Sequence, residues 1–374
     1  MKIHLWDAYN PKKMSVDLDK KFKDKISEEI NQRIYELADK FNIIPARLYD
    51  YFIYQNAPIP LDILISISKF LKIPLNQMEQ NITIYKQMFV PIKNSIKKPR
   101  LPLEITPYFT SILANLFFDG SVPKDGKGTY YNQKNKKIMN DFIEKIKNIF
   151  GDVNYSVVVD HRGVLKCRLP RIIGEICKYI YNVESFGTFD ARIPKKIFEL
   201  SRDNKIAFVL TGIIDEGSIS YDGQIFFGVS NFLLCEDFRR LCNEIGLKTT
   251  KINKNSSTNH YYFYIKSREK LLELIDYFKG RFFLISLDYK EEKLRHYFEI
   301  KKHPGLRTKK GGDERKKRIL NSLKQKKKNV NELSKELFLL PRSIRKHLKI
   351  LVKSKNILKE KIGAETYFFL GVSH

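Results

Sequence analysis

The chain has 374 residues, a length that excludes one small domain and suggests two to four. Hydrophobic residues make up 43%, so these domains can bury sizeable cores. With 69 Lys and Arg against 42 Asp and Glu, the net charge is +27, which favours a polyanionic partner, most simply nucleic acid. The alternative is a lysine-rich soluble surface of the kind common in thermophiles.

Cysteine, histidine and hydropathy patterns exclude several other classes. No two cysteines form a CxxC pair and no two histidines form an HxxxH pair, so a structural zinc site is not expected. Residues 1–7 do not form a signal peptide, and no apolar run is long enough to span a bilayer. We therefore expect a cytoplasmic protein with no membrane partner and with buried thiols at Cys167, Cys177, Cys235 and Cys242.

Two apolar stretches end alike, and the rest of the chain is arranged around them. Residues 112–120 and 209–217 each read as a helix that closes on an acid followed by glycine. Glycine suits that position because only glycine enters the left-handed region without steric cost. The acids, Asp119 and Glu216, face the negative end of the helix dipole, which suggests a cation that both share. The alternative is that both are turn signals after core helices.

These stretches resemble the two signature helices of LAGLIDADG homing endonucleases. In that family the helices pack side by side between two αββαββα halves, and the acid before the final glycine of each reaches the active site. The resemblance implies that Asp119 and Glu216 are catalytic and bind the metal. Phe118 and Asp215 stand where the family has small residues, which leaves the close helix crossing open. It also leaves Asp215 as an alternative to Glu216.

Phosphodiester hydrolysis needs an activated water, a positive charge on the phosphate and help for the leaving oxygen. Divalent ions held by two carboxylates supply all three, and Mg²⁺ keeps several waters, so few protein ligands suffice. The family also has a lysine near each active site, and position in the repeat points to Lys195 and Lys290. The resemblance further implies that two four-stranded sheets form a saddle over the major groove of double-stranded DNA, where Tyr221 and Gln224 could reach bases.

Residues 105–300 contain an internal repeat of two halves, 105–200 and 201–300. In the second half, Asp222-Gly223 lies between two β-rich runs and predicts a hairpin with a type I′ turn. Each half then continues with a helix, two strands and a closing helix. In the first half these elements are expected at 135–150, 153–159, 164–169 and 172–181, after a turn at 124–128. In the second half they are expected at 231–245, 247–253, 260–266 and 269–278.

Residues 21–85 are expected to form one domain, and their pattern is helical from Lys25 to about Ile82. This domain resembles the helix-turn-helix of phage-repressor-type DNA-binding domains. Apolar residues recur at helical spacing, and after a short break Pro45 opens a second helix. That helix would enter the major groove, with exposed contact residues at Arg47, Tyr51 and Tyr54. The alternative is an ordinary small helical bundle.

Residues 314–374 resemble a winged helix domain, with three helices followed by a hairpin around Gly363-Ala364. A winged helix that binds protein is the alternative, but the density of basic residues on the third helix favours DNA. Those basic residues are Arg342, Arg345, Lys346 and Lys349. Residues 86–104 and 301–313 combine proline with lysine and arginine and read as basic linkers, whereas residues 1–20 remain unassigned.

The sequence therefore predicts an α+β protein with a tandem αββαββα core, flanked by a helix-turn-helix domain and a winged helix domain. We expect a freestanding, monomeric homing-type endonuclease that makes a Mg²⁺-dependent double-strand break in DNA. The two similar halves of one chain would take the place of the two subunits of a dimer. Two alternatives stay open: a transcription regulator that kept the fold and lost cleavage, and an RNA maturase that acts on an intron.

Overall fold

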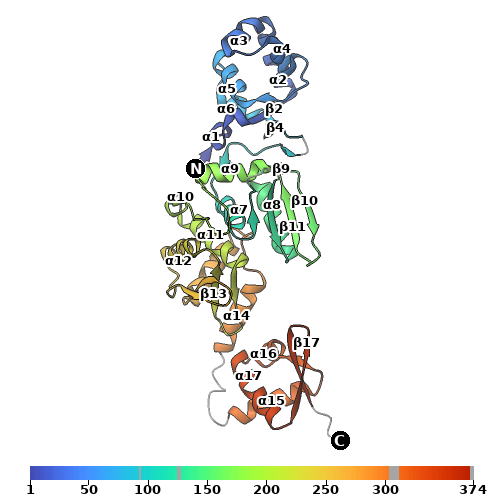
Figure 1. Ribbon diagram of the computed structural model, residues 1–374, viewed down its shortest axis with the longest axis vertical. Coiled ribbons are helices and arrows are strands. Elements are labelled where there is room, and N and C mark those ends of the chain that lie inside the picture. The colour runs from blue at the N-terminus through green and yellow to red at the C-terminus, as the bar shows by residue number, and fades with distance from the viewer. Residues whose placement is uncertain (92–93, 124–127, 303–310, 371–374) are drawn as a thin grey trace.

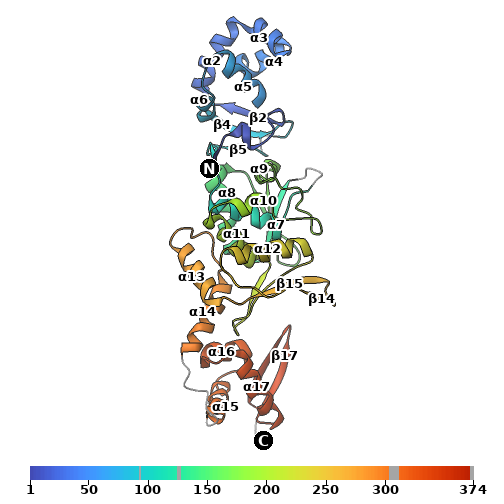
Figure 2. The ribbon, with the colours of Figure 1, turned by 90° about the vertical axis from the view of Figure 1, so that its left-hand side faces the viewer.

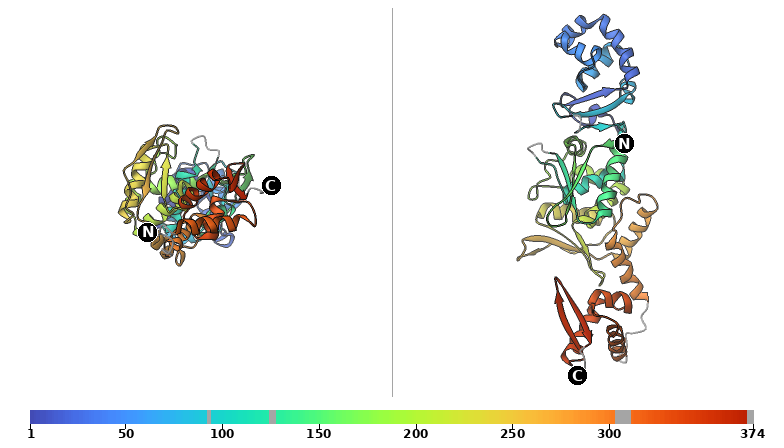
Figure 3. Two further views of the ribbon diagram at one scale, coloured as in Figure 1. Left: turned by 90° about the horizontal axis from the view of Figure 1, so that it is seen from below. Right: turned by 90° about the vertical axis from the view of Figure 1, so that its right-hand side faces the viewer.

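The computed structural model describes residues 1–91, 94–123, 128–302 and 311–370. The ribbon is elongated, and an N-terminal domain, two central halves and a C-terminal domain follow one another along its long axis (Figures 1 and 3). The fold is mixed, with helices and five small sheets in the described residues. The turn expected at 124–128 and the linker expected at 301–313 lie largely outside this part of the chain. No helix within the described ranges is long and apolar enough to cross a membrane.

The N-terminal domain is helical where the sequence predicts helices, but the helices are shorter. The helical run predicted from residue 25 begins earlier, because Asp19 caps it, and it divides at Arg33. The second predicted helix is one turn that continues as a π-helical turn at Tyr49–Ile53. The helices of this domain are α1 (Leu5–Ala8), α2 (Lys20–Gln32), α3 (Ile34–Phe41), α4 (Pro45–Leu48), α5 (Leu61–Phe70) and α6 (Leu75–Gln80).

The π-helical turn decides which tyrosines face solvent. A π-helical turn is wider than an α-helical one, so it changes which side chains share a face. Tyr51 and Phe52 both turn inward, and Tyr51 keeps only 8% of its surface exposed, whereas Tyr54 keeps 63%. The expectation that Tyr51 is an exposed contact residue is therefore wrong.

A five-stranded sheet joins the N-terminal domain to the first central half. Two segments for which the sequence predicted no strand contribute to it. Residues 1–20 contribute the strand β2, and residues 86–104 contribute β5, which pairs with β4 on one side and β9 on the other. Ile96 and Leu103 are fully buried, so the expectation of a simple linker at 86–104 is wrong. The strands of this sheet lie in the order β3 (Ile59–Pro60), β2 (Met14–Leu18), β4 (Ile82–Gln87), β5 (Ile96–Lys97) and β9 (Asp152–Val153), whereas β1 (Lys2–Ile3) and β6 (Leu103–Glu104) form a separate two-stranded sheet.

The two central halves have the same strand order. Their sheets run β10-β11-β8-β7 and β12-β13-β15-β14, so in both the fourth strand lies between the second and the third. The first half has α7 (Pro107–Phe118), β7 (Gly120–Ser121), β8 (Thr129–Gln133), α8 (Lys136–Phe150), β10 (Ser156–Val159), β11 (Leu165–Leu169), α9 (Arg171–Tyr181) and α10 (Lys195–Glu199). The second has α11 (Arg202–Asp215), β12 (Gly217–Ile219), β13 (Ile225–Val229), α12 (Phe232–Glu244), β14 (Asn253–Asn255), β15 (His260–Ile265), α13 (Arg268–Lys279) and α14 (Tyr289–Lys302).

The hairpin between β12 and β13 is present, but its turn type differs from the prediction. A type I′ turn needs positive φ at both central residues. Within this turn only Gly223 has positive φ, at +75°, and its N–H donates to the carbonyl of Ser220. This is the longer loop in which an ordinary turn is followed by one left-handed glycine. A Cβ at Gly223 would lie 2.6 Å from the ring of Tyr297, so the site also needs glycine for space.

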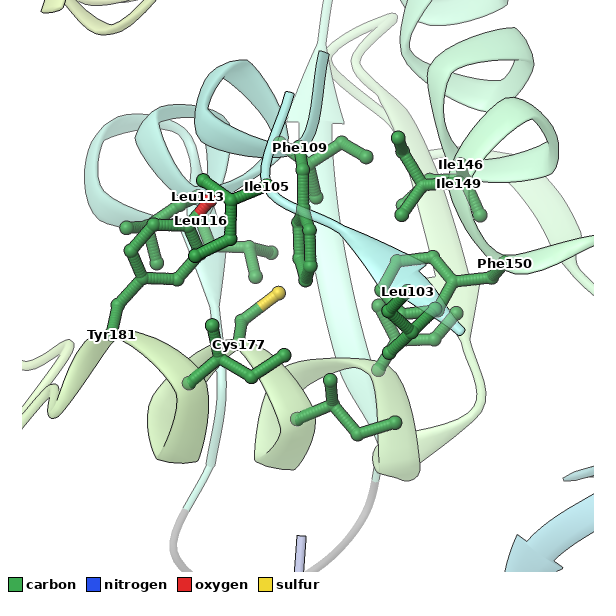
Figure 4. Close-up of a cluster of buried hydrophobic side chains, with 14 of the residues drawn as sticks. Leu103, Ile105, Phe109, Leu113, Leu116, Ile146, Ile149, Phe150, Cys177 and Tyr181 are labelled. Atoms are coloured by element: carbon green, nitrogen blue, oxygen red, sulfur yellow. The ribbon is translucent and has the colours of Figure 1, made fainter. Parts of the chain in front are cut away.

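The core is centred on α7 and α11, in which every residue from Phe109 to Phe117 and from Ile206 to Ile214 is buried. Thr106 caps α7, because its hydroxyl accepts a hydrogen bond from the backbone N–H of Phe109. Phe109 of α7 lies edge-on to Phe150 of α8 and to Tyr181 of α9, each at 5.4 Å between ring centroids (Figure 4). Aromatic contacts therefore hold α7 against both α8 and α9.

The C-terminal domain has its own small core and the predicted winged-helix elements. Ile319, Leu333, Ile344 and Leu348 are its buried centre. Three helices pack beside a sheet ordered β16-β18-β17, whose last two strands form the wing. The elements are α15 (Gly311–Leu323), β16 (Lys328–Asn329), α16 (Val330–Leu337), α17 (Pro341–Lys353), β17 (Ile357–Ile362) and β18 (Glu365–Leu370).

Candidate metal centre and nucleic-acid interface

The paired helices approach each other closely along their length. Ser111 of α7 and Thr211 of α11 share a 2.7 Å hydrogen bond between their hydroxyl oxygens. Near the C-terminal end, a Cβ on Gly212 would lie 2.7 Å from the Phe118 ring. The close crossing that the motif departures left open is therefore present, because Gly212 of the partner helix makes room for Phe118.

This packing places three acids at the C-terminal ends of the two helices. Asp119 follows α7, Asp215 is the last residue of α11, and Glu216 follows it. Burial raises the pKa of Asp119 to about 6. Burial, then repulsion by Asp119, raises the pKa of Glu216 to about 7. Each of these two acids therefore holds its proton more tightly than an ordinary carboxyl group, chiefly because it is buried.

Asp215 differs from the other two acids because its oxygens are already bound. Asn115 Nδ2 donates to one oxygen and the Tyr131 hydroxyl donates to the other, each at 2.8 Å. Burial, then repulsion by Asp119, raises the pKa of Asp215 well above its usual range, against the two hydrogen bonds. Asp119 and Glu216 have no side-chain hydrogen bond or ion pair among the residues described, so these two carboxylates are the ones open to a ligand.

Lys290 lies beside these acids, as predicted, but its ammonium is engaged with backbone. Its side chain is buried, and its Nζ donates to the carbonyls of Ile213 (3.0 Å), Ile214 and Gly217 (2.7 Å). An ammonium has three donors, and all three are used here. Burial lowers the pKa of Lys290 to about 8, while the three acids oppose that shift. Lys290 therefore binds the end of α11 and supplies positive charge at the carboxylates.

Lys195 does not join the site. It is the first residue of α10, it is exposed, and α10 leads directly into the N-terminal end of α11. A helix of the length of α11 spans about 21 Å, and the acids lie at its far end. The expectation that Lys195 lies near the acids is therefore wrong, because counting along a loose repeat placed it on the wrong side of α11.

The first half contributes a different lysine, Lys145 of α8, to the contacts around the paired helices. Its side chain is buried, and its Nζ donates to Ser111 Oγ (2.7 Å) and Asn115 Oδ1 (2.8 Å). Burial lowers the pKa of Lys145 to about 8, with Asp215 and Asp141 opposing. A sequence signal existed: Lys145 follows Ile138 by seven positions, so it falls on the apolar stripe of α8.

No group of three or more His, Cys, Asp or Glu that could hold a metal is found among the described residues. Asp119 and Glu216 would therefore form a site with two protein ligands. Both are carboxylates, and oxygen donors suit a hard cation that keeps most of its waters.

The predicted nucleic-acid contacts are partly exposed and partly engaged between domains. Arg47 and Gln224 are exposed. Tyr221 instead lies under the C-terminal domain: its ring is edge-on to His296 of α14 at 5.5 Å, and Lys335 of α16 lies 5.7 Å from its centroid. The expectation that Tyr221 reaches bases does not fit this placement.

The third helix of the C-terminal domain, α17, also contacts the second half. The backbone N–H of Arg342 donates to Asp222 Oδ1 at 3.2 Å, and Arg345 Nη1 lies 3.5 Å from Asp222 Oδ2. Lys346 and Lys349 of α17 are exposed. The hairpin turn of the second half therefore sits at the N-terminal end of α17, the helix whose basic residues favour DNA binding.

Comparison with known proteins gives one family match. The family described as "Bacterial regulatory protein, arsR family", a helix-turn-helix family, matches residues 313–354. That range covers the helices α15 to α17 and shows a helix-turn-helix at the C-terminal end of the chain. No curated protein sequence matches the chain.

Several solved structures are similar at low identity. The homing endonuclease I-DmoI, in complex with DNA and Mn, is 15% identical with a TM-score of 0.33, over 50% of this chain and 98% of that one. Full-length DUF199/WhiA from Thermotoga maritima is 13% identical with a TM-score of 0.34, over 66% and 90%. The N-terminal LAGLIDADG domain of DUF199/WhiA is 11% identical with a TM-score of 0.33, over 50% and 86%.

Proposed function

We propose that this protein is a site-specific DNA endonuclease of the homing type, which hydrolyses phosphodiesters with Mg²⁺ and leaves a double-strand break. The observation that carries the proposal is the meeting of Asp119 and Glu216, two carboxylates without a side-chain partner in the described residues. Acids with raised pKa values beside a buried lysine are typical of functional sites. Hydrogen bonds from Asn115 and Tyr131 occupy the carboxylate oxygens of Asp215. No comparable bond occupies the carboxylates of Asp119 and Glu216 in the described residues.

The donor set fits Mg²⁺ better than a softer metal. Both free ligands are oxygens, and no thiolate or imidazole groups with them in the described residues. When bound, Mg²⁺ would activate a water and stabilise charge on the phosphate and the leaving oxygen. Asp119 and Glu216 would hold the ion, and Lys290 would keep the end of α11 in place while offsetting their repulsion.

Double-stranded DNA would lie across the outer face of the first-half sheet. Lys166 and Arg168 point outward from β11, and their charged groups lie 4.5 Å and 5.9 Å from the ring centroid of Tyr130 on β8. Such a face supplies cations for phosphates and donors for base edges. Both halves lie on one chain, so a monomer would carry both acids of the metal centre. The C-terminal domain, on the same chain, would add affinity through linked binding.

A transcription regulator that lost cleavage is the second candidate function. The arsR-family match at residues 313–354 favours it, because that match is to regulatory proteins. In this case Asp119 and Glu216 would be remnants of a nuclease fold. An RNA maturase is a third candidate, and it would need recognition of unpaired or folded RNA.

The experiment that separates these functions is cleavage of genomic DNA by the full chain, with and without Mg²⁺, followed by sequencing of new ends. The nuclease predicts ends at one recurrent sequence that appear only with the metal. The double variant Asp119→Asn/Glu216→Gln is the control, because it keeps both side-chain volumes and removes the charges. Ends that persist in this variant would come from a contaminant, and no ends with the parent would favour the regulator.

A further inference from the structure

The outer faces of the two central sheets differ in chemistry although their strand order is the same. Alternate residues of a strand point to opposite faces. In the first half the outward positions of the two inner strands are polar or cationic, with Asn132, Lys166 and Arg168 beside Tyr130. In the second half the outward positions of the two inner strands β13 and β15 carry Phe226, Tyr262 and Tyr264.

Those three rings form one cluster, which we name the aromatic platform. Phe226 and Tyr264 are directly opposite in the β13–β15 ladder, and their ring centroids lie 5.8 Å apart. Tyr262 lies 5.3 Å from Phe226 and 5.9 Å from Tyr264. Gly228 faces Tyr262 in the ladder, and a Cβ there would lie 2.8 Å from the Phe226 ring. The Phe226 ring therefore extends over a position that only glycine leaves open.

The platform is not part of the core. The neighbouring residues Phe227 and Phe263 point to the opposite face, are fully buried and pack on Phe238 of α12. Tyr264 keeps 36% of its surface exposed, and Phe226 and Tyr262 are half-buried. The hairpin of β14 and β15 extends from the body of the molecule on the side of the second half (Figure 2).

The surroundings of the platform suit a nucleic acid rather than an apolar protein surface. No outward position of the four strands carries an acid, and the chain as a whole has a net charge of +27. Exposed polar and basic side chains flank the rings on the same face, at Gln224, Asn253, Asn255, His260 and Lys266. A negatively charged strand is therefore favoured here, and amides are present to bind the edges of its bases.

We propose that the aromatic platform binds unpaired bases of a single-stranded nucleic acid, two or three nucleotides at a time. Stacked base pairs of a regular duplex expose only their edges, so exposed ring faces gain little from them. An unpaired base stacks on an aromatic ring whatever its identity. The source of such bases is either an RNA loop or a locally melted DNA. The inference does not rest on cleavage, because it uses no residue of the metal centre.

The test is equilibrium binding of the full chain to labelled oligothymidylate and oligouridylate of about 12 nucleotides, and to a mixed-sequence duplex of the same length, by fluorescence anisotropy. Tyr262→Leu and Tyr264→Leu remove the ring and keep apolar volume in the strand. Tyr155→Leu is the matched control, since Tyr155 is an exposed tyrosine (43%) of the first half, outside the platform. Thermal melting of each variant checks that it is folded.

We expect each platform variant to lower the affinity for at least one single strand by about 5- to 150-fold, the usual effect of losing one stacked base. Duplex affinity should change less than about twofold, and Tyr155→Leu should leave all affinities unchanged. Preference for oligouridylate would identify RNA as the ligand, and equal binding would identify unpaired bases of either kind. An equal loss on single strands and duplex, or no loss on either, would overturn the proposal, whatever the outcome of the cleavage assay.

Discussion

Asn115 of α7 donates a 2.8 Å hydrogen bond from its Nδ2 to Asp215 Oδ2 of α11, so the last acid of one helix is bound by the other helix. Lys145 fixes the orientation of that amide by donating to Asn115 Oδ1, and Tyr131 binds the second oxygen of Asp215. Asp215 is thereby committed to the helix interface. Of the two acids that end α11, Glu216 is the one left for a cation.

The first prediction concerns this network. Asn115→Leu should lower the free energy of unfolding by about 2–3 kcal/mol, because it leaves Lys145 and Asp215 without their shared partner in a buried place. Urea denaturation measures the loss. Lys145→Met in the same background should cost less than it does alone, because the two residues act as one unit. Additive losses would show that the network is only a set of independent contacts.

The second prediction concerns pH. Asp119 and Glu216 have pKa values of about 6 and about 7 in the folded chain, above those of ordinary carboxyl groups. The folded state thus binds more protons than the unfolded state, so stability should fall as pH rises from about 4 to about 7 without metal. Mg²⁺ needs the charged acids, so the rise in melting temperature that it causes should be small at pH 5 and grow through pH 7.

Thermal melts in EDTA and in Mg²⁺ across that pH range measure both slopes. The variant Asp119→Asn/Glu216→Gln should show a smaller fall in EDTA, because the buried Asp215 still has a raised pKa, and it should show no rise in Mg²⁺. A Mg²⁺ effect of equal size in parent and variant would place the ion elsewhere on the protein.

The third prediction separates the two lysines. Lys290→Met should lower the free energy of unfolding by about 2–3 kcal/mol, because three carbonyls at the end of α11 lose their donor. Lys195→Met should stay within about 0.5 kcal/mol, because Lys195 is an exposed residue. Denaturant titration of both variants is the measurement. Equal effects would contradict the placement of Lys290 in the site.

The fourth prediction concerns the contact between α17 and the second half. Asp222→Asn should raise the affinity for duplex DNA by about two- to fivefold, because an exposed ion pair is weak and its loss frees Arg345 for phosphate. Asp276→Asn is the control, since Asp276 also pairs with an arginine, Arg295, away from α17. A fall in affinity with Asp222→Asn would mean that the contact orders α17 for binding.

Local signals predicted much of the central fold from the sequence. Asn135 and Asn231 begin α8 and α12 because an Asn side chain accepts from the first free N–H groups. Gly246 follows the end of α12 with φ at +90°, a conformation that glycine adopts without steric cost. Asp119 and Glu216 follow the apolar helices α7 and α11, and these helices bury their apolar sides against each other. The packing of the helices therefore brings their C-terminal ends together.

The features that were missed depend on tertiary contacts. Lys145 is on an apolar stripe, and only packing against α7 makes it a donor to Asn115. Residues 86–104 contain prolines and lysines, yet Ile96 enters a sheet because strands from both neighbouring domains offer it partners. Tyr51 turned inward because a π-helical turn replaced regular helix, and no residue type marks that choice.

The central claim is that Asp119 and Glu216 hold a divalent ion with which the protein cuts DNA. The most direct test selects the DNA that the protein binds and then adds the metal. The full chain is bound to a randomised duplex library in EDTA, so that the preferred site is enriched without cleavage. Mg²⁺ is then added to the enriched complexes, and new DNA ends are sequenced. We predict double-strand breaks at one position of the enriched site, and at least about a 10²–10³-fold lower rate for Asp119→Asn and for Glu216→Gln, with binding retained. Tight binding of the enriched site by the parent with no breaks after Mg²⁺ would contradict the account and favour a regulator. Breaks lost in Asp215→Asn and kept in Glu216→Gln would contradict the assignment of the second acid.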